Sequence, residues 1–401
     1  TTTGVLNTSM GYVSMYQNTT GSSNVAIGPY ALWQANSNNN IAIGLNALTQ
    51  GGGNGQNVAI GVEAGTNAQD AQNIFIGHQA GKFSTTISSS VAIGTYALLN
   101  NVTGTALTAI GRGSLQNNTA GGNTAMGYLS AYNNTSGSGI TAIGNSASYS
   151  NTTGANNTSL GAGALYTNST GSQNTAIGYA ALNYTTGGAN TGVGYSSMSS
   201  NTTGQENTAM GSRVLLSNTT GNQNSAFGGL ALYQNSTGSR NTAMGYFSLF
   251  NNTTSNNTAI GYYALYNNNA NYNTAVGYNS GITLVSGENN VIIGDSANVV
   301  GGGIVETTIV GSNSTASNRS AVLGAFAVGN ESSVVIGHGA SAGAGTNSVV
   351  IGRGAASTAT NQFVVGSAAY NAGSVTTESV VSDTTWSVRI NGTAYKILLK
   401  A

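Results

Sequence analysis

The strongest constraint on the fold is a glycine-centred repeat that fills almost the whole chain. A small or branched residue, an apolar residue and then Gly recur in 23 copies from Gly11 to Gly366. The spacing averages about 16.7 residues up to Gly311 and about 13.8 residues beyond it. A unit of this length cannot bury an apolar face alone, whereas stacked copies can. The sequence therefore predicts a rod of repeated coils rather than a globular domain.

Each position of the repeat has its own chemistry. The residue before the motif Gly is apolar in every copy, and the residue two before it is mostly Ala up to Ala275 and Ile or Val afterwards. Segments such as 174–178 are too short for a helix and suit a strand, with Thr175 and Ile177 on one face and Ala176 on the other. Turn-forming Asn-Thr-Thr-Gly stretches separate these strands. We expect an all-β fold, a β-solenoid of about 23 coils whose thin core holds one Ile and one or two small side chains per coil.

The change of period divides the chain into three parts. We expect a β-roll shaft over 1–311, a β-roll of 13- to 15-residue repeats over 312–366 and a C-terminal β-hairpin cap over 367–401. Asn391-Gly392 between two β-rich runs is typical of a two-residue hairpin turn. Such a hairpin would close the open strand edge that a solenoid end exposes.

Charge is almost absent from the sequence. Nine Lys and Arg residues balance nine Asp and Glu residues, so only 4% of the chain is charged, against roughly 25% in an ordinary soluble domain. Zero net charge argues against nucleic-acid binding and against polybasic membrane attachment, and no apolar run is long enough to insert into a membrane. A chain this poor in charge, with no Cys, is typical of a rigid extracellular structure.

Two segments carry a resemblance to a known family. Asn347-Ser-Val-Val-Ile-Gly-Arg-Gly-Ala355 and the segment 333–342 resemble the head repeats of YadA-like trimeric autotransporter adhesins. The match is closest over 312–366, and the longer repeats over 1–311 are similar to expanded versions found in bacteriophage tail-fibre proteins. The resemblance implies left-handed parallel β-rolls that assemble into a homotrimer.

The end of the chain resembles phage tail-fibre proteins more than autotransporter adhesins. The segment 387–399 is similar to the terminal hairpins of phage fibre proteins, and no heptad-repeat stalk of the autotransporter kind follows the repeats. The expected function is that of a non-enzymatic tail-fibre shaft, part of a virion, which contacts a host cell-surface glycan or protein receptor and assembles with other virion or fibre proteins. A bacterial trimeric adhesin head is the alternative.

Aromatic residues are distributed unevenly and indicate where a receptor would bind. They concentrate between residues 246 and 278, and an aromatic residue recurs five positions after the motif Gly, so that stacked coils would align them. Exposed Tyr rows can contact sugar rings, and the alternative is packing between chains. The candidate glycan or receptor contacts are Tyr246, Phe250, Tyr262, Tyr263, Tyr266 and Tyr278.

The last coils carry the residues expected to hold the chains together. Ile or Val replaces Ala two positions before the motif Gly, which adds apolar surface wherever that face is covered by another chain. We expect residues 285–366 to make the tightest contact between chains. The candidate trimer contacts are Ile292, Ile309, Val322, Val335, Val350 and Val364.

Catalytic, cofactor and metal sites are not predicted. His78 and His338 both follow a motif Gly and are interpreted as surface residues, although symmetric copies meeting on a trimer axis could bind a metal or an anion. A glycosidase needs two carboxyl groups about 5 to 10 Å apart, and Glu288 with Asp295 or Glu306 could come close on adjacent coils. We interpret these carboxylates as solvated charges, and a capsule depolymerase fibre remains an alternative.

A column of Thr supports a third alternative, an ice-binding β-solenoid. Thr stands three positions before the motif Gly in many copies, as at Thr158, Thr175 and Thr191, and would stack at strand spacing. The partner column is Ala rather than a second Thr, and Val or Ile interrupts the row. Both features disfavour ice binding relative to a structural fibre.

Overall fold

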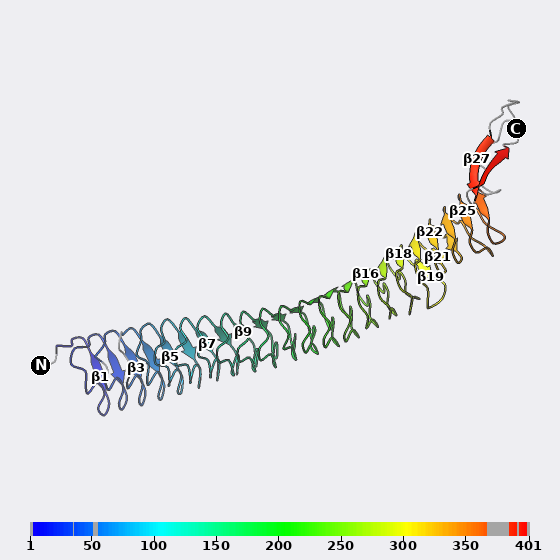
Figure 1. Ribbon diagram of the computed structural model, residues 1–401. Helices are drawn as coiled ribbons and strands as arrows, with labels where there is room; N and C mark the ends of the chain where they lie inside the picture. The colour runs from blue at the N-terminus through cyan, green and yellow to red at the C-terminus, as the bar shows by residue number, and fades with distance from the viewer. Residues whose placement is uncertain (1–2, 35, 51–54, 367–384, 391–392, 399–401) are drawn as a thin grey trace.

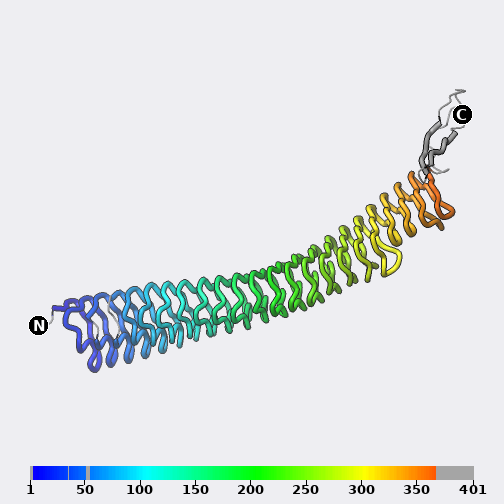
Figure 2. Tube along the Cα trace, in the orientation of Figure 1, coloured from blue at the N-terminus to red at the C-terminus, as the bar shows by residue number. Residues whose placement is uncertain are grey.

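The chain folds into a gently curved rod of stacked coils (Figures 1 and 2). The computed structural model describes residues 3–34, 36–50, 55–366, 385–390 and 393–398, the last two ranges as backbone only. All regular structure in these ranges is β-strand, and none of it is helix. The prediction of an all-β solenoid is thus confirmed.

One long parallel sheet of 23 strands runs along the rod. Most of these strands have three residues, and each precedes a motif Gly. Its strands are β1 (Thr8–Met10), β2 (Val25–Ile27), β3 (Ile41–Ile43), β4 (Val58–Ile60), β5 (Ile74–Ile76), β6 (Val91–Ile93), β7 (Thr108–Ile110), β8 (Thr124–Met126), β9 (Thr141–Ile143), β10 (Thr158–Leu160), β11 (Thr175–Ile177), β12 (Thr191–Val193), β13 (Thr208–Met210), β14 (Ser225–Phe227), β15 (Thr242–Met244), β16 (Thr258–Ile260), β17 (Thr274–Val276), β18 (Val291–Ile293), β20 (Thr308–Val310), β22 (Ala321–Leu323), β24 (Val334–Ile336), β25 (Val349–Ile351) and β26 (Phe363–Val365).

Equivalent residues of successive coils pair in register. Thr175 lies opposite Thr191 and Ile177 opposite Val193, and the same correspondence holds along the whole sheet. Parallel pairing of this kind turns every position of the repeat into a column that runs along the rod. Side chains at one repeat position therefore meet one another.

The two faces of the sheet have opposite roles. Ala176 is fully buried, whereas Thr175 and Ile177 lie on the outer face and are half-buried. The predicted alternation is confirmed, but the predicted core of one Ile per coil is wrong, because the Ile column points outward. The Ala column instead packs against residues three and four positions after the motif Gly, such as Ala181 and Leu182.

The predicted trimer contacts in the last coils lie on the inner face. Ile292, Ile309, Val322, Val335 and Val350 are 0% exposed in the single chain, and half-buried Val364 packs against the same core cluster. They have no surface free for a partner chain, so this prediction is wrong. These larger side chains fit on the inner face because the last coils have more space inside. These coils carry Thr315, Ser341 or Ala356 where earlier coils carry Leu, and a larger side chain on the strand fills that space.

The same exchange of volume occurs once near the other end of the rod. Phe75 replaces Ala on β5, and Gly replaces Leu in the turns before and after this strand, at Gly65 and Gly81. A Cβ atom on Gly65 would lie 2.7 Å from Phe75 Cδ2, and one on Gly81 would overlap the Phe75 ring. The ring thus occupies the space that two leucine side chains fill elsewhere.

Buried asparagines connect the coils on the inner side. Asn207, four positions before its motif Gly, is fully buried, and its Oδ1 accepts the backbone N–H of Asn224 at 2.9 Å. Its Nδ2 donates to the carbonyl oxygen of Gly221 at 2.8 Å. The same pattern recurs at most coils, as at Asn174 and Asn190. Each amide therefore satisfies two backbone groups of the next coil that would otherwise be buried without a partner.

The motif glycines allow the coils to approach closely at the end of each strand. Gly178 has a φ of 127°, and a Cβ atom there would lie 2.5 Å from the carbonyl oxygen of Gly194 and 2.7 Å from its carbonyl carbon. Real Cβ atoms do not tolerate such distances to backbone atoms. Gly is therefore required at this position by space as well as by φ.

The C-terminal coils and the terminal strands form two smaller sheets. The strands β19 (Asn298–Val299), β21 (Thr315–Ala316) and β23 (Val328–Gly329) form a parallel sheet where the repeat shortens. The strands β27 (Thr385–Ile390) and β28 (Thr393–Leu398) pair antiparallel. The predicted turn at 391–392 lies outside the described residues, and closure of the solenoid edge by these strands stays a prediction.

Candidate functional site

Three columns of side chains meet at the corner that follows the long sheet. They are the residues one, two and five positions after each motif Gly. On the coils that begin at Gly245 and Gly261 all three positions are aromatic. We call the resulting surface the aromatic patch; it consists of Tyr233, Tyr246, Phe247, Phe250, Tyr262, Tyr263, Tyr266 and Tyr278.

Two of the columns form stacked ladders. Phe250 lies between Tyr233 and Tyr266, with ring centroids 5.0 and 5.2 Å apart and interplanar angles of 2° and 7°. Tyr262 lies between Tyr246 and Tyr278 in the same way, at 5.9 and 5.5 Å. The coil spacing of about 4.8 Å imposes this stacking. The structure thus brings all six predicted contacts together.

Phe247 and Tyr263 join the two ladders. Both adopt positive φ values, 60° and 55°, which turns their side chains into the space between the columns. Phe247 contacts Tyr246 at a centroid distance of 4.3 Å and Phe250 at 5.0 Å. Tyr263 contacts Tyr262 and Tyr266 in the same manner. Eight rings therefore form one continuous surface, and Tyr233 and Phe247 are the two members that the predicted contacts omit.

The patch presents ring edges and hydroxyl groups to solvent. Tyr246, Tyr262 and Tyr278 are all about half exposed, and their faces are covered by one another within the ladder. Desolvation, followed by the neighbouring Tyr263, raises the pKa of the Tyr262 hydroxyl further above its ordinary value of 10.0. A row of neutral hydroxyls between apolar edges can donate and accept hydrogen bonds along an elongated polar ligand.

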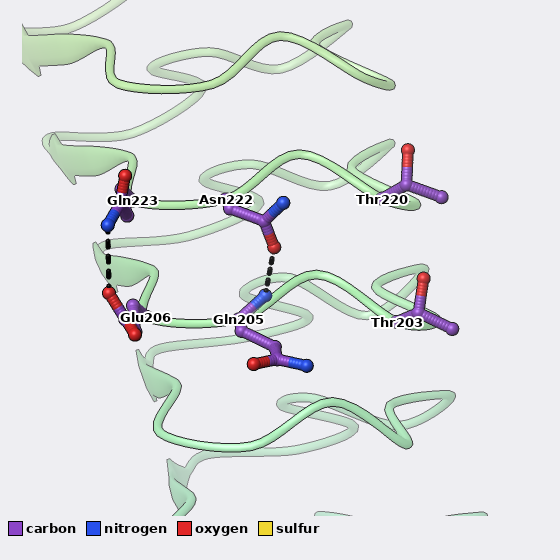
Figure 3. Close-up of a pocket in the computed structure, with 6 residues that line it drawn as sticks. All are labelled: Thr203, Gln205, Glu206, Thr220, Asn222 and Gln223. Atoms are coloured by element: carbon purple, nitrogen blue, oxygen red, sulfur yellow. Dashed lines mark hydrogen bonds between the residues drawn. The ribbon is translucent and has the colours of Figure 1, made fainter.

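A polar depression elsewhere on the shaft has no catalytic pair. Figure 3 shows Glu206 accepting a hydrogen bond from Gln223 Nε2 at 3.0 Å, beside Gln205, whose backbone N–H donates to Asn222 Oδ1 at 2.7 Å. Glu206 is the sole carboxylate among the six residues that line it. Hydrolysis of a glycosidic bond requires two.

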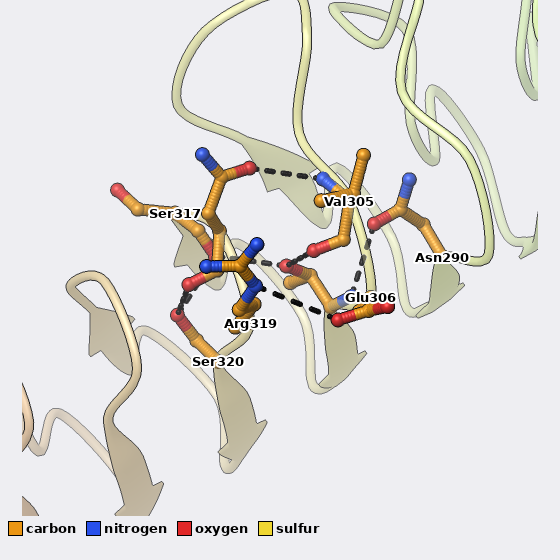
Figure 4. Close-up of polar contacts among 8 residues, drawn as sticks. Asn290, Val305, Glu306, Ser317, Arg319 and Ser320 are labelled. Atoms are coloured by element: carbon orange, nitrogen blue, oxygen red, sulfur yellow. Dashed lines mark hydrogen bonds and ion pairs between the residues drawn. The ribbon is translucent and has the colours of Figure 1, made fainter.

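Glu288 and Glu306 lie side by side on adjacent coils, as expected, with the Glu306 backbone N–H donating to the Glu288 carbonyl oxygen at 3.1 Å, but their carboxylates have separate partners. Glu306 forms an ion pair with Arg319 at 3.5 Å (Figure 4), and Glu288 accepts a hydrogen bond from Asn271 Nδ2 at 3.3 Å. Asp295 lies beyond strand β18 from Glu288, directly after the motif Gly. Among the described residues there is also no group of three His, Cys, Asp or Glu side chains able to hold a metal ion.

Both histidines stand at the same corner as the aromatic columns. His78 contacts Tyr96 edge to face at 5.6 Å, and His338 contacts Phe326 at 5.5 Å. Both His78 and His338 are exposed. In the single chain they are surface residues, as interpreted from the sequence.

One ion pair near the N-terminal end is partly enclosed. Lys82 Nζ lies 2.7 Å from Glu63 Oε2, and Gln79 donates to the same oxygen. The hydrogen bond from Lys82, and then that from Gln79, hold the pKa of Glu63 below its ordinary value of 4.5. A carboxyl with a lowered pKa stabilises the fold where it is ionised, and this contribution is lost as pH falls through the folded-state value.

Replacing Glu63 by Gln is therefore expected to make the shaft less sensitive to acid. The variant should be less stable than the wild type at about pH 6, and the difference should shrink toward about pH 3. Thermal midpoints followed by circular dichroism across this range measure the effect. A difference that stays constant with pH would contradict the role of the carboxylate charge.

Comparison with known proteins assigns no family. No family model matches the chain, and no curated protein is significantly similar to it. The described part of the chain also contains no helix that could cross a membrane. The functional argument therefore rests on the surfaces of the rod.

Proposed function

We propose that the chain is a non-enzymatic structural fibre, the shaft of a phage tail fibre, which trimerises and carries a receptor-contacting surface for host attachment. One observation supports this proposal most directly. The outer face of the long sheet carries an apolar column that extends over all 23 strands, beside a second column that is uncharged. A rod without an enzymatic pair in its described grooves and with one uncovered apolar face is suited to assembly.

The outer face is uncharged from end to end. Its first column is the aliphatic residue before each motif Gly, and Met126, Leu160 and Leu323 in it are each exposed by 40% or more. Its second column, two residues earlier, carries Thr, Ser, Val, Ile, Ala or Phe and no charged residue. Monomeric soluble proteins rarely expose a continuous apolar surface larger than a few hundred Å². Copies of the same chain match this face in length and register.

This face replaces the inner column as the proposed trimer contact. The second column is mostly apolar near both ends, from Val25 to Val91 and from Val291 to Phe363, and carries Thr or Ser between Thr108 and Thr274. The contact between chains would thus be most apolar at the two ends of the shaft and more polar in its middle. The inner column therefore no longer supports the prediction that residues 285–366 make the tightest contact between chains.

A charge on the outer face is expected to weaken the trimer. Three chains of 39.9 kDa give about 120 kDa, and Ile143→Asp with Ile177→Asp places six carboxylates in the contact, where each would lose its water. Native mass spectrometry should show the wild type as a trimer and the double variant as monomers. Thr203→Asp, on an exposed turn, is the control and should stay trimeric. A wild type of 39.9 kDa would contradict the proposal.

The aromatic patch is the proposed receptor-contacting surface on this shaft. Supporting it are eight contiguous rings, three of them about half exposed, on a corner of the rod that is distinct from the apolar outer face. The alternatives have distinct signatures. Ice binding would produce thermal hysteresis, but the Thr column stands beside Ile, Met, Leu and Phe of unequal length, which gives an uneven surface. A depolymerase would release reducing sugar ends.

A further inference from the structure

A second feature lies at the same corner of the rod, several coils before the aromatic patch. Gly113 stands two positions after its motif Gly, where the neighbouring coils carry Tyr96 and Leu129. A notch of about 280 Å³ lies at this position. Besides Gly113 and Leu129, its lining residues are Tyr96, Arg112, Gln116, Tyr128, Tyr132 and Tyr149.

Backbone conformation does not require Gly at this position. Gly113 has a φ of 66°, and Tyr96, Leu129 and Ser146 adopt φ values of 62°, 52° and 52° at the equivalent positions with a side chain present. A Cβ atom on Gly113 would lie 2.7 Å from Leu129 Cδ2 and 3.3 Å from Gln116 Oε1. Neighbouring side chains lie close over the glycine, so a side chain at position 113 would push Leu129 or Gln116 into the notch.

The notch also carries an isolated positive charge. Arg112 is the sole Asp, Glu, Lys or Arg between Lys82 and Glu206. Its guanidinium carbon lies 5.9 Å from the centroid of the Tyr128 ring, and it forms no ion pair with any residue that the structure describes. No nearby carboxylate screens this charge, so it is available to an anion.

We propose that this notch binds one carboxylate-bearing monosaccharide, a uronic or sialic acid unit of a cell-surface glycan. The planar guanidinium of Arg112 matches a carboxylate in two parallel hydrogen bonds. The tyrosine walls contact the apolar face of the sugar ring, and the Gln116 amide is placed to bond its hydroxyls. The volume is slightly below the roughly 300 Å³ at which sites for drug-sized ligands begin, which suits a single ring.

The inference deepens the proposed receptor contact and rests on it, but it does not depend on trimer formation. The notch lies on the corner after the sheet, whereas the proposed trimer contact is the outer face of the strands. Two features of the same shaft separate the contributions of cavity and charge. A neutral notch of similar volume surrounds Gly163, and Arg213 lies over the Tyr195 ring at 5.8 Å, outside both notches.

The test uses the full chain and isothermal titration calorimetry. The probes are trigalacturonic acid, its methyl ester, sialyllactose and lactose, so that each acidic saccharide has a neutral counterpart. At least one acid should bind the wild type, about tenfold or more tightly than its counterpart, and added salt should weaken it. Arg112→Gln and Gly113→Ser should each reduce this affinity at least about tenfold. Arg213→Gln and Gly163→Ser are the matched controls and should bind like the wild type.

Several results would overturn the inference. They are equal binding of an acid and its neutral counterpart, wild-type affinity in Arg112→Gln, or no binding of either acid at about 10 mM. Arg112 is exposed and Ser146 occupies the position equivalent to Gly113, so both variants should fold, which circular dichroism verifies. Native mass is measured on the same samples. If the chain is a trimer and binds no acidic sugar, the sugar-binding proposal for the notch fails and the fibre proposal stands. If the chain is a monomer and binds an acidic sugar, the trimeric fibre proposal fails and the sugar-binding proposal stands.

Discussion

Replacing Gly178 by Ala is expected to disrupt the stack of coils at that point. The added Cβ atom would lie 2.5 Å from a backbone oxygen of the next coil, and φ of 127° is strained for any residue with a side chain. The next coil cannot move away, because it is hydrogen-bonded on both sides. We expect a loss of about 3 kcal/mol or more, measured as a lower midpoint of unfolding by heat or guanidinium.

Gly122→Ala is the control for this variant. Gly122 also has a positive φ, 71°, but a Cβ atom there would have no heavy atom within 4 Å. The control should lose only the cost of a left-handed conformation, about 1 kcal/mol. Equal losses in both variants would show that φ alone, and not the contact between coils, requires the motif glycines.

The Phe75 ring and the glycines that leave room for it should depend on each other for stability. Phe75→Ala is expected to cost about 3–5 kcal/mol, since it leaves a cavity between two coils that have no Leu. Gly81→Leu alone should also be destabilising, because its side chain would overlap the Phe75 ring.

The double variant Phe75→Ala with Gly81→Leu is expected to recover much of this loss. It restores the pairing of Ala and Leu that the next coil has at Ala92 and Leu98, and Leu98 shows that Leu adopts the required φ, at 51°. Unfolding midpoints of the wild type, the two single variants and the double variant form a cycle that measures the coupling. Additive losses would show that the ring and the leucines do not share one volume.

The sequence was sufficient to predict the solenoid but not the direction of its faces. Alternation in 174–178 separates Ala176 from Thr175 and Ile177 without stating which face is inside. Because Ile is more hydrophobic than Ala, the sequence favours Ile in the interior, whereas in the structure Ala176 is buried and Ile177 faces outward. The reason is that Leu182 reaches in from the following turn and leaves room for only a small residue. The loss of Leu in the same coils where Ala becomes Val or Ile was the signal that could have shown this.

The stacking of aromatic residues within each column could be predicted from the sequence, but the joining of the columns into one surface could not. Repeat spacing alone aligned Tyr233, Phe250 and Tyr266, because residues at one position must stack. The bridging of two columns by Phe247 depends on positive φ in the turn, which no local pattern of these residue types indicates. The notch at Gly113 depends on how side chains of neighbouring coils pack around the glycine, which repeat spacing does not indicate. The periodic Asn four positions before the motif Gly is the signal in the sequence for the buried Asn column.

The asparagine ladder has a consequence for how such a rod changes over generations. The amides bond backbone atoms of the adjoining coil, and several also bond the equivalent Asn of the coil before, so each needs only another copy of the same repeat beside it. Duplicating or deleting one whole repeat would therefore preserve every junction and alter the reach of the rod by about 4.8 Å. An insertion of part of a repeat would misalign all columns at once. The length of the rod can therefore change only in steps of one repeat, and recombination between repeats can produce such a step without requiring a new core.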